Sequence, residues 1–264
     1  MPSPAPLIDT RNDVDARYLT TDDQVSFHEV SMTYSTGTTA LSSVTLEVRR
    51  GEFVAIVGPS GCGKSTLLRL AAGLERPSTG SVAVGTSSVG FIFQDATLMP
   101  WATVRKNASL LVDLQRMRAS ERDAKVHAAL AAVGLQEFAD QLPTSLSGGM
   151  RMRVSLARAL ALEPDLMLLD EPFGALDELT RQEMQLQLLD VCERRGLTSV
   201  FVTHSVSEAV LLADRVIVMS ARPGQIAADI AVDLPRPRSP LLRFEPKYTQ
   251  TVAHISTLLR EVAS

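Results

Sequence analysis

The chain has 264 residues, of which 45% are hydrophobic and 21% are charged, and its formal net charge is −4. This balance is typical of a soluble globular protein with a sizeable core. A net negative charge argues against a nucleic-acid binder that works by neutralising phosphates, so we expect no nucleic-acid partner. The basic runs Arg194-Arg195 and Arg236-Pro237-Arg238 are short, and we expect both to be solvated. No apolar run approaches the length of about eighteen residues that a membrane-spanning helix requires.

The first half of the chain begins with a segment that carries three prolines, scattered charges and no apolar signal core. We interpret residues 1–22 as a disordered tail rather than a secretory signal. A stretch from about 103 to 142 is rich in Ala, Leu, Arg and Glu, which favours an inserted helical lobe. A helix is predicted from 64 to 72. Strands are predicted at 25–34, 40–49, 53–57, 81–84 and 90–93.

In the second half, residues 178–195 form a predicted long helix that Gly196 ends. Strands that alternate with helices indicate a largely parallel sheet. A last helix is indicated near the C-terminus by apolar residues that share one face, namely Val252, Ile255, Leu259 and Val262. Further strands are predicted at 166–169, 199–203 and 215–220.

Residues 58–65 read G-P-S-G-C-G-K-S, which fits the phosphate-binding pattern G-x-x-x-x-G-K-[ST]. The glycines let successive backbone N–H groups curl around a β-phosphate, Lys64 reaches the β- and γ-phosphate oxygens, and the Ser65 hydroxyl ligates Mg²⁺. The loop joins a predicted strand to a predicted helix, whose N-terminus adds partial positive charge. The expected ATP contacts are Gly58, Pro59, Ser60, Gly61, Cys62, Gly63, Lys64, Ser65 and Thr66.

Cys62 and Cys192 are the only cysteines of the chain. A disulfide at Cys62 would distort the nucleotide site, so we expect both thiols to be reduced in a cytosolic setting. Cys62 is either sensitive to oxidation or, as we favour, an unreactive small side chain.

An apolar strand ends in two carboxylates, Asp170 and Glu171. Asp170, at the strand tip, can hold Mg²⁺, usually through water. Glu171 is the candidate general base that orients and deprotonates the attacking water. Alone, such a dipeptide is most simply a solvated pair, but an upstream phosphate loop favours the catalytic interpretation.

Further motifs follow in an order that resembles the ATP-binding-cassette (ABC) ATPases. Leu146-Ser147-Gly148-Gly149 is similar to the family signature, and Gln94 matches the Q-loop glutamine. Gly174-Ala175-Leu176-Asp177 matches the D-loop, and His204 the switch histidine. Tyr34 lies where the family places an aromatic that stacks on adenine, although packing explains it equally well.

The resemblance runs from about residue 25 to 230 and implies an α/β P-loop NTPase fold. Such a fold has a mostly parallel sheet, an antiparallel β subdomain and an inserted helical subdomain, here at about 100–160. We expect the ATPase domain to span residues 23–235. Residues 236–264 are then a C-terminal extension that ends in a helix.

The resemblance also implies an ATPase that uses ATP and Mg²⁺. Catalysis is expected from Glu171, His204, Lys64 and Gln94. His204 can donate a hydrogen bond to the γ-phosphate as charge builds in the transition state. Gln94 is expected to touch Mg²⁺ or the attacking water, so the expected metal contacts are Ser65, Gln94 and Asp170.

In this family the signature meets the γ-phosphate that the other protomer holds. The resemblance therefore implies that Ser147, Gly148, Gly149 and Asp177 contact nucleotide across a head-to-tail dimer, most simply a homodimer. A helix start suits this role, because its backbone N–H groups can bind an anion.

Within the family, Leu98-Met99-Pro100-Trp101, Met150, residues 209–214 and Arg222-Pro223-Gly224 look most like the nitrate/sulfonate/taurine importer ATPases. That branch implies separate transmembrane permease subunits, a periplasmic or lipid-anchored substrate-binding protein, and a cytoplasmic place on the inner face of the membrane. The expected contact with the permease lies near Gln94 to Trp101. Trp101 is either core filler or an exposed anchor for that contact.

Two residues depart from the family pattern: Met152 replaces a usual glutamine, and Ser205 replaces a common aspartate. Two other functions stay open. A soluble ABC-type ATPase that serves chromosomes, ribosomes or cofactor assembly usually carries coiled coils, a second cassette or basic extensions, and none is visible here. A scaffold that binds nucleotide without hydrolysing it is disfavoured by the intact Glu171 and His204.

Overall fold

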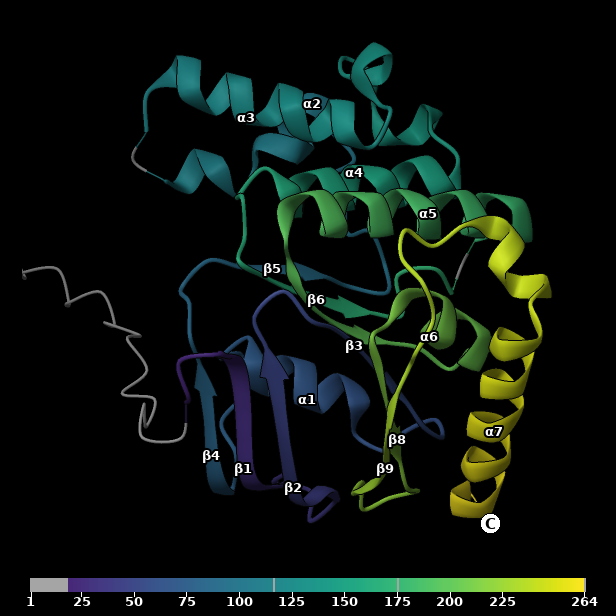
Figure 1. The fold of residues 1–264 in the computed structure, drawn as a ribbon. Coiled ribbons are helices and arrows are strands. Elements are labelled where there is room, and N and C mark those ends of the chain that lie inside the picture. The colour runs from purple at the N-terminus through teal and green to yellow at the C-terminus, as the bar shows by residue number, and fades with distance from the viewer. Residues whose placement is uncertain (1–18, 116, 175, 264) are drawn as a thin grey trace, which may run out of the picture.

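A computed structural model describes residues 19–115, 117–174 and 176–263. Most of the tail predicted over 1–22 therefore lies outside the described residues. The chain enters its first strand through a turn, where the Thr20 hydroxyl donates to the Asp23 carboxylate at 2.6 Å. Figure 1 shows a central sheet with helices on both faces, a small antiparallel sheet on one side and the C-terminal helix along an edge.

The central sheet has six strands in the order β5-β6-β7-β3-β8-β9. The strands from β5 to β8 are parallel, and β9 (Ile226–Ala231) pairs antiparallel with β8. This arrangement confirms the largely parallel sheet, whereas β9 was not predicted. The remaining strands are β3 (Phe53–Val57), β5 (Val89–Ile92), β6 (Leu166–Asp170), β7 (Thr198–Val202) and β8 (Arg215–Met219).

Alternation along the strands divides the interior into two cores. In β3, Phe53, Ala55 and Val57 face a core shared with the helices α4 (Gly148–Leu160), α5 (Glu178–Arg195) and α6 (Val206–Leu212). Val54 and Ile56 face the opposite core, which includes α1 (Lys64–Ala71) and the inner side of the small antiparallel sheet. Both sides of the sheet are therefore covered, as a parallel sheet requires.

The small sheet has three antiparallel strands in the order β2-β1-β4. They are β1 (Asp23–Thr33), β2 (Thr39–Arg49) and β4 (Thr79–Val84). The predicted pairing of the first two strands is confirmed, with Phe27 opposite Leu46 and Val30 opposite Val44.

The stretch predicted as a helical lobe contains α2 (Val104–Ser109), α3 (Ala119–Ala132) and α4 (Gly148–Leu160). The helix α5 spans Glu178–Arg195, as predicted. It ends at Gly196, whose φ of 60° is the left-handed conformation that glycine adopts at low cost. In Figure 1 these helices lie together above the central sheet.

The C-terminal segment packs against α6 (Val206–Leu212) and ends in α7 (Pro246–Ala263). The apolar face predicted for this last helix is confirmed, because Ile255 is fully buried and its three partners pack against the same core. We expected the short basic run 236–238 to be solvated, and this is wrong. Arg238 is buried and donates to the carbonyl oxygens of Val210 and Ala213 at 2.8 Å, satisfying groups that a helix end leaves unpaired.

Candidate active site

The phosphate-binding loop joins the buried strand β3 to α1 (Lys64–Ala71) and depends on glycine conformation. Gly61 has a φ of 75° and Gly63 a φ of 104°, which residues with a Cβ rarely adopt. A Cβ at Gly63 would also lie 2.6 Å from Leu41 Cδ2 and 2.8 Å from the Ala40 carbonyl oxygen. Both backbone freedom and close approach to β2 therefore require glycine at position 63.

The Lys64 ammonium is buried inside this loop. It donates to the carbonyl oxygens of Gly58 and Pro59, each at 2.9 Å. The cation is thus held at the concave side of the loop, next to the N-terminus of α1. A phosphate group placed there would meet a fixed positive charge as well as helix N–H groups.

Ser65 and Asp170 meet across the carboxyl ends of two strands. The Ser65 hydroxyl donates to Asp170 Oδ1 at 2.8 Å. Burial raises the pKa of Asp170, and the Ser65 hydrogen bond opposes that rise. A hydroxyl and a carboxylate side by side form an oxygen donor set of the kind that Mg²⁺ takes together with phosphate oxygens and water, so these residues fit the ion.

Glu171 follows Asp170 in the chain, and here the backbone turns out of the sheet. Its φ of 46° is a strained conformation for a residue with a side chain. Its backbone N–H donates to the Val202 carbonyl oxygen, which continues the β6–β7 ladder past the strand end. Its Oε2 lies 3.2 Å from Nδ1 of His204. Sequence positions that are 33 apart are thereby brought into hydrogen-bond contact.

An open cleft of about 510 Å³ lies beside these groups, lined by one partner of each pair, Ser65 and Glu171. Gln94, two residues beyond β5, lines it together with Lys64. Tyr34 lines the other end, where its hydroxyl is 3.1 Å from Thr66 Oγ1 and donates to Glu75 Oε2 at 3.0 Å. The cleft therefore brings the adenine-side and phosphate-side candidates together in one chain.

Arg222 also lines this cleft, and we did not predict it as a site residue. Its Nε and Nη2 donate to the Gly61 carbonyl oxygen at 3.0 and 2.9 Å. Gly224 fixes the loop that carries Arg222, because a Cβ at Gly224 would lie 1.9 Å from the Cys62 carbonyl oxygen. The motif Arg222-Pro223-Gly224 was visible in the sequence, but only its contact with the phosphate loop assigns it to the site.

The predicted signature residues begin α4 but do not line the cleft among the residues the structure describes. Ser147 caps α4 by accepting from the Met150 N–H at 3.2 Å. Asp177 caps α5 in the same way, and the hydrogen bond from Thr180 lowers its pKa. A Cβ at Gly149 would lie 2.3 Å from Thr180 Cγ2, so the starts of the two helices are in close contact.

Comparison with known proteins decides the family. A family profile described as "ABC transporter" matches residues 41–174. The chain belongs to the ABC transporter family. The solved structures that resemble it include the ATP-binding cassette MJ0796 bound to ADP and Pi, at 33% identity and a TM-score of 0.71 over 80% of this chain and all of that one. They also include cbiO1 from Clostridium perfringens, part of the ABC transporter complex cbiONQ, at 27% identity and a TM-score of 0.74 over 91% of this chain and 97% of that one.

Similar ABC proteins include an ATP-binding protein of Brucella abortus (strain 2308), which is 49% identical over 85% of this chain and 89% of its own length. The bicarbonate transport ATP-binding protein CmpC of Synechococcus elongatus is 48% identical over 75% of this chain and 32% of its own length. The nitrate import ATP-binding protein NrtC of the same organism is 47% identical over 79% of this chain and 33% of its own length. This chain is thus an ABC ATPase similar to import proteins.

The two departures from the family pattern have structural explanations in this ABC protein. Met152 is buried against Leu156, Leu169 and Phe173, where an amide would need partners that an apolar core lacks. Ser205 caps α6, since its hydroxyl accepts from the Glu208 N–H at 3.4 Å. Serine is as good an N-cap as aspartate, so the helix start is retained.

The loop from Gln94 to Trp101 is held from within the ABC fold. Arg158 of α4 donates to the carbonyl oxygens of Ala96 and Thr97. Asn107 is fully buried; it accepts from the Met99 N–H at 2.8 Å and donates to the Ala102 carbonyl oxygen at 2.9 Å. Trp101 itself is 78% exposed, which excludes core filler. A fixed loop thus presents a large apolar side chain to solvent.

Proposed function

We propose that this chain is the ATP-hydrolysing subunit of an ABC importer, working on a small solute of the nitrate, sulfonate or taurine kind. The observation that carries the ATPase assignment is the convergence of two contacts on one cleft. Ser65 and Asp170 are 2.8 Å apart beside Lys64, and Glu171 and His204 are 3.2 Å apart at the same strand edge. The importer assignment is supported by similarity to CmpC and NrtC, whose names give bicarbonate transport and nitrate import.

In the proposed site the phosphate-loop N–H groups and Lys64 hold the β- and γ-phosphates of ATP, and Tyr34 stacks on the adenine. Ser65 and Asp170 would hold Mg²⁺, which neutralises charge on the phosphates when it is bound. Gln94 lies where its amide can reach the ion or the attacking water.

For hydrolysis, the Glu171 carboxylate accepts a proton from the attacking water and so acts as general base. His204 donates a hydrogen bond to the γ-phosphate oxygen on which charge increases. The Glu171–His204 contact supports this pairing, because each side chain orients the other. The strained backbone at Glu171 points the carboxylate away from the sheet and toward the cleft.

We also propose that a second copy completes the site. Ser147, Gly148, Gly149 and Asp177 begin helices whose N–H groups suit an anion, yet they do not line the cleft of their own chain among the described residues. A head-to-tail homodimer would place them on the nucleotide that its partner holds. ATP would then join the two copies.

The proposed transport partners are permease subunits that lie in the membrane and a periplasmic or lipid-anchored substrate-binding protein. Trp101, on the loop that Asn107 and Arg158 fix, would contact a permease. In the described part of the chain, no helix is both long enough and apolar enough to cross a membrane. We propose a cytoplasmic position on the inner face of the membrane, reached through the permease.

Two measurements test this function. Glu171→Gln is expected to abolish turnover and to accumulate an ATP-bound dimer in size-exclusion chromatography, whereas Glu183→Gln, at an exposed carboxylate of α5, should leave both unchanged. Wild-type turnover by Glu171→Gln would contradict the general-base assignment. Purification from membranes should recover a permease, and Trp101→Ala should weaken its recovery. Isolation only with ribosomes or chromosomes would instead support the soluble alternative.

A further inference from the structure

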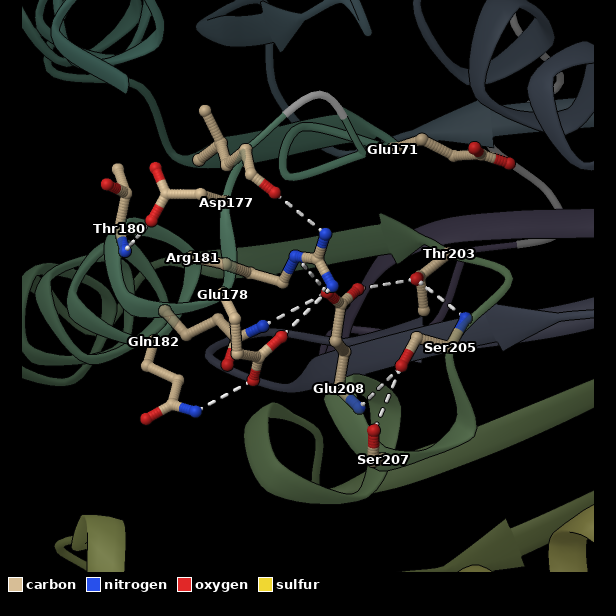
Figure 2. A network of polar contacts seen from close by, with 12 residues as sticks. Glu171, Asp177, Glu178, Thr180, Arg181, Gln182, Thr203, Ser205, Ser207 and Glu208 are labelled. Atoms are coloured by element: carbon tan, nitrogen blue, oxygen red, sulfur yellow. Dashed lines mark hydrogen bonds and ion pairs between the residues drawn. The ribbon is translucent and has the colours of Figure 1, made fainter. Parts of the chain in front are cut away.

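A buried carboxylate lies next to the candidate switch histidine. Glu208, in the first turn of α6, is 8% exposed. Its Oε2 accepts from the Thr203 hydroxyl at 2.6 Å, and its Oε1 accepts from the Gln185 amide at 3.1 Å. In Figure 2 a dashed line joins the Glu208 carboxylate to the Thr203 hydroxyl.

Thr203 fixes the backbone on both sides of His204. While it donates to Glu208, it accepts from the Ser205 N–H at 3.0 Å. On the strand side, the Thr203 N–H donates to the Ile56 carbonyl oxygen of β3. His204 therefore projects from a segment that Thr203 anchors on both sides, through its N–H and its hydroxyl, and Glu208 orients that hydroxyl.

Arg181 contacts both the D-loop and the Glu208 carboxylate. Its Nη2 donates to the Leu176 carbonyl oxygen at 2.8 Å, directly before Asp177. Its Nε lies 3.7 Å from Glu208 Oε1, as an ion pair rather than a hydrogen bond. Figure 2 shows Arg181 lying between the Asp177 turn and Glu208.

The C-terminal segment reaches the carboxylate through Gln185. Arg243 Nη2 donates to Gln185 Oε1 at 2.5 Å. Because arginine can only donate, this contact assigns the amide oxygen to Arg243 and leaves the amide nitrogen to donate to Glu208. From α7, the Tyr248 hydroxyl donates to the Ser207 carbonyl oxygen at 2.8 Å, which holds the first turn of α6 directly.

Burying this charge is costly, and its surroundings offset only part of the cost. Burial raises the pKa of Glu208, while the Thr203 hydrogen bond and the Arg181 charge oppose the rise. An apolar side chain at this place alone would leave the Thr203 hydroxyl, the Gln185 amide and the Arg181 charge without their partner. What the carboxylate adds is the orientation of the segment that carries His204.

We propose that Glu208 is a positioning residue for His204, and that the C-terminal segment, through Arg243 and Tyr248, holds Glu208 and the start of α6 in the working arrangement. The inference rests on the proposed role of His204. Loss of the Arg243 contact or the Tyr248 contact loosens the segment that carries His204. The phosphate loop and the Ser65–Asp170 pair stay in place. Turnover should therefore fall while nucleotide affinity is retained.

The experiment is a double-mutant cycle on the full chain. Arg243→Ala is expected to lower kcat about 2- to 30-fold, the range for residues that act through a packed network. The KM for ATP and the Kd of a non-hydrolysable ATP analogue should not change. In a His204→Ala background, Arg243→Ala should cause no further loss. Lys247→Ala is the matched control, because Lys247 lies in the same segment but pairs with exposed Asp233.

Tyr248→Phe removes one hydroxyl and serves as a second variant if Arg243→Ala fails to fold; it should lower kcat in the same way. Arg243→Lys, which keeps a charged donor, should recover part of the loss. The inference is overturned if these variants match wild type, or if they reduce kcat equally with and without His204. If His204→Ala keeps full turnover, the proposed role of His204 fails instead, and the two failures are thereby distinguished.

Discussion

The Ser65 hydroxyl and the Asp170 carboxylate are 105 positions apart in the chain and 2.8 Å apart in space. Ser65 lies in the first turn of α1, after β3, and Asp170 is the last residue of β6. The two strands belong to one sheet, in which β7 lies between them. Carboxyl ends of parallel strands lie at one edge, which explains why a serine and an aspartate so distant in sequence are in hydrogen-bond contact.

Asp170→Asn should impair metal use more than nucleotide binding. The amide keeps the size and an oxygen but loses the charge that favours Mg²⁺. We expect kcat to fall about 100-fold or more, because a bound metal contributes several kcal/mol to charge stabilisation. Titration of an ATP analogue with and without Mg²⁺ provides a readout independent of turnover: Mg²⁺ should tighten binding to wild type but hardly to the variant. If Mg²⁺ tightens binding equally in wild type and in Asp170→Asn, the assignment of Asp170 to the metal site is contradicted.

Gly63→Ala should damage the phosphate loop for two separable reasons. The positive φ costs about 1–2 kcal/mol for a residue with a Cβ. The added atom would in addition collide with Leu41 and Ala40. Gly37→Ala is the matched control, because Gly37 also has a positive φ but no atom lies within 4 Å of its Cβ position. In chemical denaturation, the free energy of unfolding should fall clearly more for Gly63→Ala than for Gly37→Ala. An equal fall in both variants would show that close packing at position 63 plays no part.

Arg222→Ala should weaken ATP binding without abolishing turnover. The guanidinium donates to the Gly61 carbonyl oxygen, and its positive charge lines the cleft. Loss of an exposed hydrogen bond worth about 1 kcal/mol would raise the KM for ATP roughly fivefold. Arg194→Ala, which breaks an exposed pair with Asp190 on α5, should have no effect. An unchanged KM in Arg222→Ala would assign the arginine no part in the site.

Local motifs account for what the sequence predicted well. The phosphate loop, the helix start at Ser147 and the helix stop at Gly196 each depend on a few consecutive residues whose conformational preferences are strong. By contrast, Arg222 reaches Gly61 across 161 positions, and no local pattern indicates that contact. The edge strand β9 reads I-A-A-D-I-A, and its three alanines and one aspartate are poor strand formers that give a weak strand signal. Arg238 was misassigned because its partners are helix-end carbonyl groups, which leave no pattern in the side chains.

Cys192 should make stability depend on pH in alkaline solution. Burial raises the pKa of this thiol from 9.0 to about 11. The unfolded thiol ionises first, so the free energy of unfolding falls as the pH rises through this window. The loss reaches about 1 kcal/mol near pH 10 and about 2–3 kcal/mol above pH 11. Cys192→Ala lacks this group, so the difference in unfolding free energy between wild type and the variant should shrink with pH, and a constant difference would contradict the prediction.

Gly149→Ala should destabilise the contact between the starts of α4 and α5. The new Cβ would lie 2.3 Å from Thr180 Cγ2, and such overpacking costs about 1–3 kcal/mol. Adding Thr180→Ser removes the Cγ2 methyl group and should restore most of the stability, as measured by urea unfolding. If the double variant stays as unstable as Gly149→Ala, the contact with Thr180 Cγ2 is not the cause of the lost stability.

The same pair of variants separates packing from nucleotide contact at Gly149. If the stability of the double variant returns but kcat stays low, the remaining defect lies on the face proposed to meet the partner's nucleotide, where a Cβ obstructs the approach of phosphate to the helix N–H groups. If stability and kcat return together, Gly149 acts only through its contact with Thr180. The proposed contact between Gly149 and nucleotide would then be wrong, while the packing explanation would hold.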